Sequence, residues 1–169
     1  MGCSVRFVGG QRTVAGGTSG RGFGRAISTA LADAGWHVVG VARTASDLES
    51  VRAEAGTRFT PITGDATDEA LGSRLIDEHR PRLVVLNAGA TPHSAPLAQQ
   101  TWDTFSTNWH TDTRHVFGWT KAALTAGLSP GSTVIAMSSG AALRGSPLSG
   151  GFAGANATIR FISDYAAEE

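Results

Sequence analysis

Short apolar runs alternate with helix-like segments along nearly the whole 169-residue chain. This alternation is typical of β-α-β units, in which each helix returns the chain to begin a neighbouring parallel strand. Strands are expected at 12–17, 37–43, 58–65, 83–89 and 132–139, and helices at 24–35, 47–56, 69–80, 101–127 and 152–167. The pattern predicts an α/β fold, with a doubly wound parallel sheet of about five strands and helices on both faces.

For two of these segments, the sequence also predicts how they pack in the fold. The run 83–89, LVVLNAG, is apolar on both faces of a strand, so it is expected at the centre of the sheet. The helix 24–35 ends at a glycine and has one apolar face that we expect to meet the core. That face comprises Ala26, Ile27, Ala30, Leu31 and Ala34.

Composition narrows the class of protein. A single domain over residues 1–169 is expected, because the chain is long enough for one core and shows no repeat or linker. Fourteen basic residues balance fourteen acidic ones, which excludes a strongly basic nucleic-acid surface, and no run has the apolar length of a membrane span. One cysteine, Cys3, excludes an internal disulfide, and no residue grouping has metal-site spacing. A cytoplasmic protein is therefore expected.

A glycine-rich turn, AGGTSGRGFGRAI, lies between the first strand and the first helix. Glycines here permit positive φ and close approach of the backbone to a pyrophosphate, and the helix N-terminus offers free N–H groups to the anion. A purely steric role for these glycines remains the alternative. The glycines are Gly16, Gly17, Gly20, Gly22 and Gly24.

The end of the second strand indicates which dinucleotide would bind. An acidic residue there would bind the ribose hydroxyls of NAD, whereas an arginine accommodates the additional phosphate of NADP. This strand ends in Arg43, and Arg21 within the glycine-rich turn offers a second cation. NADP(H) is therefore expected in preference to NAD(H), unless both arginines are ordinary surface residues.

Together these stretches resemble the short-chain dehydrogenase/reductase family over nearly the whole chain from about Thr13. The resemblance implies a Rossmann-like fold, with the glycine cluster as the cofactor turn carrying one additional residue. The segment GDAT places Asp65 where the family contacts the adenine ring. The segment LNAG places Asn87, Ala88 and Gly89 beside the adenosine ribose and the central sheet.

The same resemblance implies an active site. Asn108 corresponds to the active-site asparagine of the family, and Ser139 in MSSG to its catalytic serine. About thirteen residues later the family has a Tyr-x-x-x-Lys pair, whose tyrosine protonates the substrate oxygen while the lysine lowers its pKa and holds the nicotinamide ribose. Phe152 and Asn156 occupy these two positions here. Neither can replace the group it stands for, so carbonyl reduction is expected to be impaired or lost.

His93 offers an alternative proton donor. It follows the strand 83–89 at the sheet edge where ligands of such folds bind, and a histidine titrates near neutral pH. A surface-loop histidine without chemistry is the other interpretation.

Two further expectations come from the resemblance. Family members continue beyond the last helix with another strand, a lid and a final strand-helix unit, whereas this chain ends in SDYAAEE. The chain would then be a fragment, have an open pocket, or be completed by another chain. The segments 101–126 and 152–167 correspond to the helices that family members use for dimerisation, so a homo-oligomer is expected.

Three functions remain open at this stage. The first is an NADP(H)-binding reductase homologue with a degenerate active site and a small-molecule ligand. The second is an active enzyme that uses another donor, such as His93, or non-redox chemistry. The third is a non-catalytic scaffold or regulatory protein.

Overall fold

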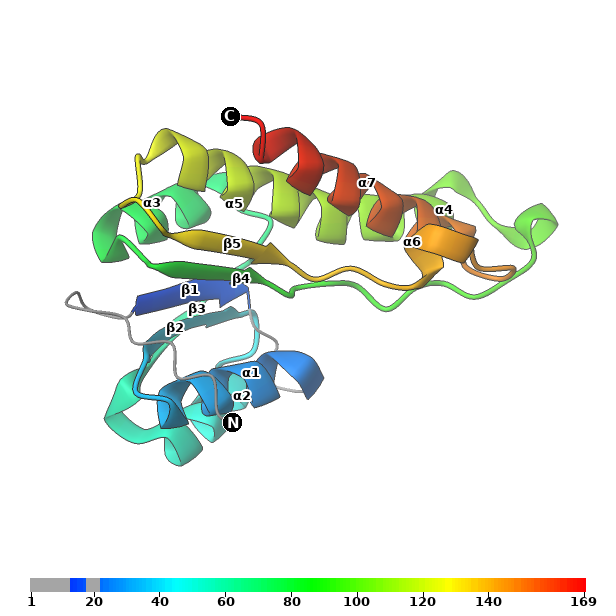
Figure 1. Ribbon diagram of the computed structural model, residues 1–169. Helices are drawn as coiled ribbons and strands as arrows, with labels where there is room; N and C mark the ends of the chain where they lie inside the picture. The colour runs from blue at the N-terminus through cyan, green and yellow to red at the C-terminus, as the bar shows by residue number, and fades with distance from the viewer. Residues whose placement is uncertain (1–12, 18–21) are drawn as a thin grey trace, which may run out of the picture.

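A five-stranded parallel sheet lies at the centre of the molecule (Figure 1). The computed structural model describes residues 13–17 and 22–169. Every neighbouring strand pair is parallel, and the order across the sheet is β3-β2-β1-β4-β5. The strands are β1 (Thr13–Gly17), β2 (His37–Ala42), β3 (Phe59–Thr63), β4 (Leu83–Leu86) and β5 (Thr133–Ala136). The predicted doubly wound α/β fold is confirmed.

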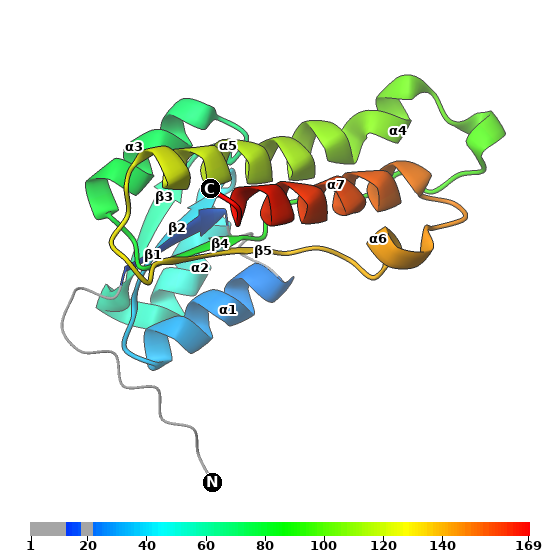
Figure 2. The ribbon, with the colours of Figure 1, turned by 45° about the horizontal axis from the view of Figure 1, so that its top comes forward.

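Helices cover both faces of the sheet. One layer contains α1 (Gly22–Asp33) and α2 (Ala45–Ala55), and the other contains α3 (Glu69–His79), α5 (Arg114–Thr125) and α7 (Gly150–Ala166) (Figure 1). The turned view shows α4 (Trp102–Asn108), α6 (Ala141–Arg144) and the first turns of α7 extending past the sheet (Figure 2). Short 3-10 turns lie at Gly56–Arg58 and Leu97–Gln99.

The larger hydrophobic core fills the space between the sheet and the layer of α3, α5 and α7. At its centre, Trp119 is fully buried and its indole N–H donates to the Ala66 carbonyl at 2.9 Å. Residues Val84, Val85 and Leu86 of β4 are buried, and the strand lies between β1 and β5. It is therefore an interior strand, as its two apolar faces predict, although β1 is the middle strand of the sheet. The cluster comprises Val41, Leu75, Ile76, Val84, Leu86, Val116, Trp119, Ala122 and Ile159.

The predicted buried face of the first helix is wrong. Gly24, Ser28 and Ala32 are the buried residues of α1, whereas Ala26, Ala30 and Ala34 are exposed and Ile27 and Leu31 are half-buried. Small side chains spaced four residues apart lie on one side of a helix and allow it to approach its neighbours closely. The longer side chains then flank this contact, and Leu31 packs at the border of a second core cluster.

The long helix predicted over 101–127 is interrupted. A π-helical segment, Trp109–Thr113, separates α4 from α5 without ending the helical path. A π segment adds a residue to one turn and often occurs at functional sites. The final helix begins at Gly150 rather than residue 152, and the short helix α6 was not predicted.

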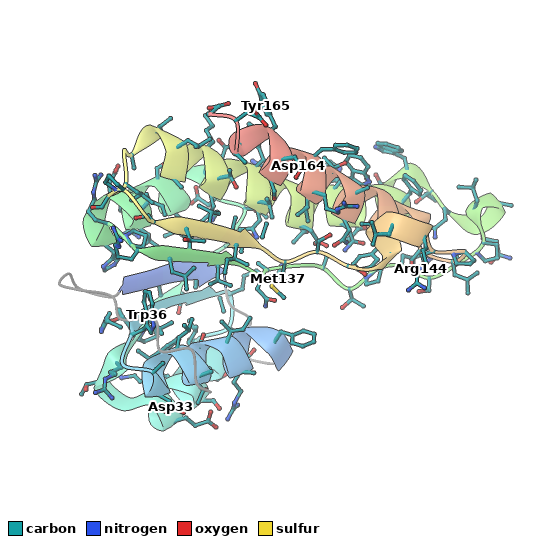
Figure 3. All side chains as sticks on the ribbon, viewed as in Figure 1. Asp33, Trp36, Met137, Arg144, Asp164 and Tyr165 are labelled. Atoms are coloured by element: carbon teal, nitrogen blue, oxygen red, sulfur yellow. The ribbon has the colours of Figure 1, made fainter. Side chains whose placement is uncertain are left out.

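Side chains on the outer side of α7 extend away from the sheet. Tyr165 projects from the far end of α7, and Met137 lies just beyond β5 (Figure 3). Among the helices of the described residues, none has the length and apolarity needed to cross a membrane.

Candidate active site

Many of the predicted site residues lie where the parallel strands end. The chain adds β2 and β3 on one side of β1, and then β4 and β5 on the other side. Ligands of open α/β sheets bind at the carboxyl edge beside such a change of side, which here lies between β1 and β4. Two pockets of about 460 and 450 Å³ lie along this edge. Both are lined by Ala88 and Gly89, so they form neighbouring parts of one groove.

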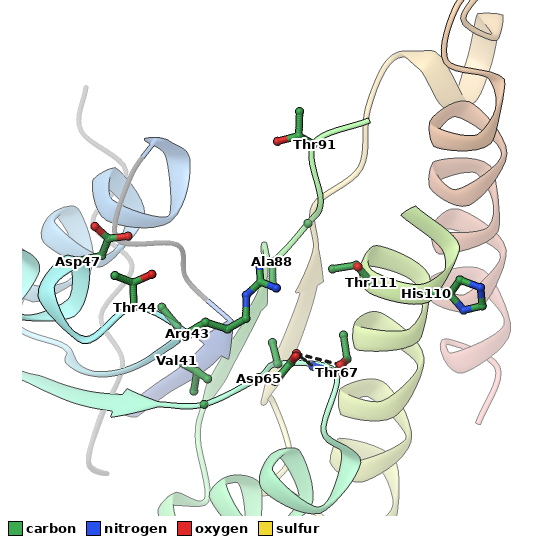
Figure 4. A pocket seen from close by; sticks show the side chains of 14 residues that line it. Val41, Arg43, Thr44, Asp47, Asp65, Thr67, Ala88, Thr91, His110 and Thr111 are labelled. Atoms are coloured by element: carbon green, nitrogen blue, oxygen red, sulfur yellow. Dashed lines mark hydrogen bonds between the residues drawn. The ribbon is translucent and has the colours of Figure 1, made fainter. Parts of the chain in front are cut away.

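The outer pocket follows the ends of β2 and β3 (Figure 4). Arg43 comes directly after β2 and lines this pocket, and no described hydrogen bond or ion pair occupies its guanidinium. Asp47 lines the same pocket, so the site contains both a cation and a carboxylate. The labelled lining residues are Val41, Arg43, Thr44, Asp47, Asp65, Thr67, Ala88, Thr91, His110 and Thr111.

Asp65 is held in place just after β3. The backbone N–H and the hydroxyl of Thr67 both donate to one Asp65 oxygen, Oδ1, at 2.9 Å. These hydrogen bonds hold the pKa of Asp65 below its ordinary value, with smaller contributions from the charges of Arg43 and Arg114. Asp65 is therefore an oriented carboxylate in the outer pocket that can accept hydrogen bonds from a ligand.

A buried histidine lies behind this pocket. His115 of α5 is fully buried against Trp119, with ring centroids 6.0 Å apart in an edge-to-face arrangement. Burial lowers the pKa of His115 to about 4, while the Ala88 backbone and the negative charge of Asp65 act in the opposite direction. His115 is neutral at physiological pH and contributes to packing.

The inner pocket lies between the start of α1, the segment after β4, the segment after β5 and α7. It brings together seven of the predicted site residues, namely Gly22, Asn87, Ala88, Gly89, Ser139, Phe152 and Asn156. The other described lining residues are Phe23, Ala90, Asp112, Met137, Ser138 and Ile159. Residues far apart in the sequence thus meet in one pocket.

The side chains in the serine, tyrosine and lysine positions differ in the polar groups that they can offer to a ligand. The Ser139 hydroxyl oxygen accepts from the Ala141 N–H at 3.2 Å, so its own O–H can donate into the pocket. Phe152 offers no polar atom from its ring. The Asn156 amide donates to the Phe152 carbonyl at 3.0 Å, so it is bonded to its own helix, where a lysine would extend a charge into the pocket.

Near the expected position of the active-site asparagine, Asn108 is buried and Asp112 lines the inner pocket. Asn108 is buried and does not line the inner pocket; its amide donates to the Ala90 carbonyl at 2.8 Å and to Asp112 Oδ2 at 3.0 Å. Asp112 lines the pocket, and its Oδ1 accepts from the Ala90 N–H at 2.8 Å. Burial raises the pKa of Asp112, although these hydrogen bonds oppose the rise.

Sequence reasoning missed Asp112. Its spacing of four residues from Asn108 was the available signal, since such residues share a helical face. The π segment around it has no comparable signature in the sequence.

Several predicted residues lie elsewhere. His93 is exposed and lines neither pocket, and its backbone carbonyl accepts a hydrogen bond from the Gln100 amide. Gly16 and Gly17 are the last residues of β1, and Gly24 is buried in the first turn of α1. Gly20 and Arg21 lie outside the described residues. No group of three or more potential metal ligands occurs within the part of the chain that the structure describes.

The groove fits an extended anionic dinucleotide. Gly22 has φ of +57° and begins α1 at the wall of the inner pocket, which places the N-terminal N–H groups of a 12-residue helix there. Arg43 provides a cation at the other end of the groove. A Cβ atom at Gly89 would lie 3.3 Å from the Asp112 carboxyl group, so glycine permits the close packing between the two pockets.

The family comparison agrees with this arrangement. A family model described as enoyl-(acyl carrier protein) reductase matches residues 16–169. The structure is similar to a short-chain dehydrogenase from Mycobacterium avium (TM-score 0.82, 23% identity, 94% of this chain and 65% of that one). A short-chain dehydrogenase/reductase from Brucella melitensis gives a TM-score of 0.86 at 20% identity, over 97% of this chain and 71% of that one. The chain belongs to the short-chain dehydrogenase/reductase family.

Among curated proteins the chain resembles two serine 3-dehydrogenases. The protein from Rhizobium radiobacter is 35% identical and that from Agrobacterium fabrum 38% identical, each over 96 residues. The matched segment is 51% of this chain and 36% of each relative. The match therefore spans about a third of the length of these relatives. Membership of the family implies a nicotinamide cofactor.

Proposed function

We propose that the protein is an NADP(H)-binding oxidoreductase homologue whose carbonyl and alcohol redox activity is impaired. The observation that supports this proposal is the inner pocket itself, where Ser139, Phe152 and Asn156 lie together beside the segment Asn87–Gly89. The pocket retains its hydroxyl donor, but has lost the proton donor and the cation that the family uses.

NADP(H) is the proposed cofactor because of Arg43. A guanidinium after the second strand of such a sheet can hold the additional phosphate of NADP, and no hydrogen bond or ion pair among the described residues occupies that of Arg43. The Asp47 carboxylate in the same pocket would favour the ribose hydroxyls of NAD, so NAD(H) is the alternative ligand. When bound, the nicotinamide ring supplies hydride chemistry, while Arg43, Asp65 and the start of α1 would hold the rest of the molecule.

The rate penalty of the missing donor is large. A positioned general acid contributes about 10²–10⁴-fold to a rate, and the Ser139 hydroxyl alone would stabilise a developing alkoxide poorly. His93 does not compensate, because it is exposed and lines neither pocket. The names of the curated relatives make serine-like hydroxy acids the first substrates to test, together with small ketones.

Restoring the missing pair tests the proposal. The double variant Phe152→Tyr, Asn156→Lys should gain NADPH-dependent carbonyl reduction by about 10²-fold or more over the wild-type chain. Phe152→Tyr alone should gain less, because no lysine lowers the pKa of the new tyrosine. Wild-type turnover at ordinary enzyme rates would contradict the proposal. A double variant that binds NADPH and gains nothing would favour a scaffold function.

We further propose a homo-oligomer formed through residues 101–126 and 152–167. We name as the α5–α7 surface the exposed apolar residues Phe117, Leu124, Phe161 and Tyr165. Phe117, Leu124 and Tyr165 line one shallow hollow of about 150 Å³ between these helices. An exposed apolar surface of this kind on adjacent helices supports association with a second copy.

A further inference from the structure

The inner pocket contains an isolated carboxyl group. Asp112 is the one titratable side chain among the described residues that line it, and none of those residues is cationic. The side chain is only 6% exposed, so water screens it weakly. In the lysine position Asn156 adds no charge.

Its hydrogen bonds fit the ionised form. The Ala90 N–H donates to Oδ1 at 2.8 Å and the Asn108 amide donates to Oδ2 at 3.0 Å. Two N–H donors directed at the two oxygens are the partners that a carboxylate accepts. The same two bonds hold Asp112 in a fixed position against the pocket wall formed by Gly89.

We propose that Asp112 makes the inner pocket selective for a cationic ring, so that the chain binds the oxidised, positively charged nicotinamide in preference to the neutral reduced form. The inference rests on the proposed function, because it requires that the dinucleotide binds in this groove. A buried charge without a counter-charge is unfavourable, and a ligand that supplies the opposite charge recovers part of that cost. With Asn156 in the lysine position, the described residues that line the pocket supply no such charge, and a bound ligand can supply it.

The affinity ratio of NADP⁺ to NADPH tests this inference without any catalytic readout. Calorimetry would give both dissociation constants for the wild-type chain and for Asp112→Asn, which removes the charge at nearly constant size. The ratio should fall by about threefold or more in the variant, the order expected for a unit charge in a partly screened pocket. The matched control is Asp103→Asn, the same change at an exposed position of α4 outside both pockets.

A second variant keeps the test decisive if Asp112→Asn fails to fold. Asn156→Lys adds a compensating cation to the pocket and should lower the same ratio. An unchanged ratio in every variant that folds would overturn the inference while NADP(H) binding stands. No binding of either dinucleotide to the wild-type chain would overturn the inference and the proposed cofactor together.

Discussion

His115 illustrates how one buried side chain couples the site to stability. Its ring is enclosed by the core behind the outer pocket, and neither ring nitrogen has a described hydrogen-bond partner of good geometry. A histidine in such a place resists protonation in the folded state but not in the unfolded chain. The stability of the protein should therefore depend on pH through this residue.

The expected pH dependence has a defined sign. The pKa of His115 is lowered from 6.5 to about 4 on folding, so the unfolded state binds the proton first as the pH falls. The contribution is present above pH 6.5 and is lost progressively toward pH 4, amounting to about 2 kcal/mol between pH 7.5 and pH 5. Denaturant unfolding at several pH values measures it. In His115→Phe this pH dependence should largely disappear. If the free energy of unfolding changes with pH equally in both proteins, His115 is not the residue responsible.

Asp112 and Asn156 show what could be predicted at single positions. The register from Ser139 to Phe152 and Asn156 came from the family resemblance, and the structure brings all three to the inner pocket. Asp112 could not be predicted in the same way, because its access to the pocket depends on the π segment. The exposure of His93 likewise depends on the path of a loop, which local sequence does not determine.

The contact between α4 and α7 explains a glycine in the active-site helix. A Cβ atom at Gly151 would lie within 3 Å of the Phe105 backbone carbonyl carbon and closer still to its oxygen, so the two helices could not keep their present separation. At Gly150 the nearest atom to such a Cβ is a Phe105 ring carbon at 3.6 Å, an ordinary contact. The close approach positions Phe152 and Asn156 relative to the π segment.

Gly151→Ala should therefore destabilise the protein by about 3 kcal/mol, since the clash is with backbone and cannot be relieved by a rotamer change. Gly150→Ala is the matched control and should be neutral or slightly stabilising, because alanine favours the helix. Thermal unfolding of both variants makes the comparison. Equal melting temperatures would show that α4 and α7 are not held this closely.

Element types were predictable, whereas irregularities within the elements were not. Apolar runs such as 83–89 and the glycine stop of the first helix have strong local signatures, and the corresponding β4 and α1 are present. The buried face of α1 was mispredicted because small residues at Gly24, Ser28 and Ala32 pack more closely than the larger ones beside them. The short helix α6 is similarly determined by its tertiary surroundings.

At the scale of the whole molecule, the α5–α7 surface should decide the oligomeric state. A homodimer would have twice the 17.4 kDa mass of one chain. Phe161→Glu places a charge on this surface and should shift the protein toward monomers, whereas Leu97→Glu alters an equally exposed side chain on another segment and should not. Sedimentation equilibrium measures the molecular mass in solution of the wild-type chain and of both variants. A wild-type monomer would contradict the proposed interface.

The sheet order explains how so many predicted residues meet. Parallel strands place their carboxyl ends on one edge, so the segments that follow β2, β3, β4 and β5 share the groove although they span a large part of the chain. This convergence could be predicted from the alternation of strands and helices. The preference for NADP(H) over NAD(H) has weaker support from the sequence, because Arg43 and Asp47 line the same pocket and favour different cofactors.

A titration with NADPH and NADH in parallel tests the proposed binding of NADP(H) in this groove. Quenching of tryptophan fluorescence would follow binding, with calorimetry as confirmation, in the wild-type chain and in Arg43→Ala. We expect saturable binding that favours NADPH, and a loss of that preference in the variant. Binding of neither nucleotide, or a preference for NADH that Arg43→Ala leaves unchanged, would contradict it.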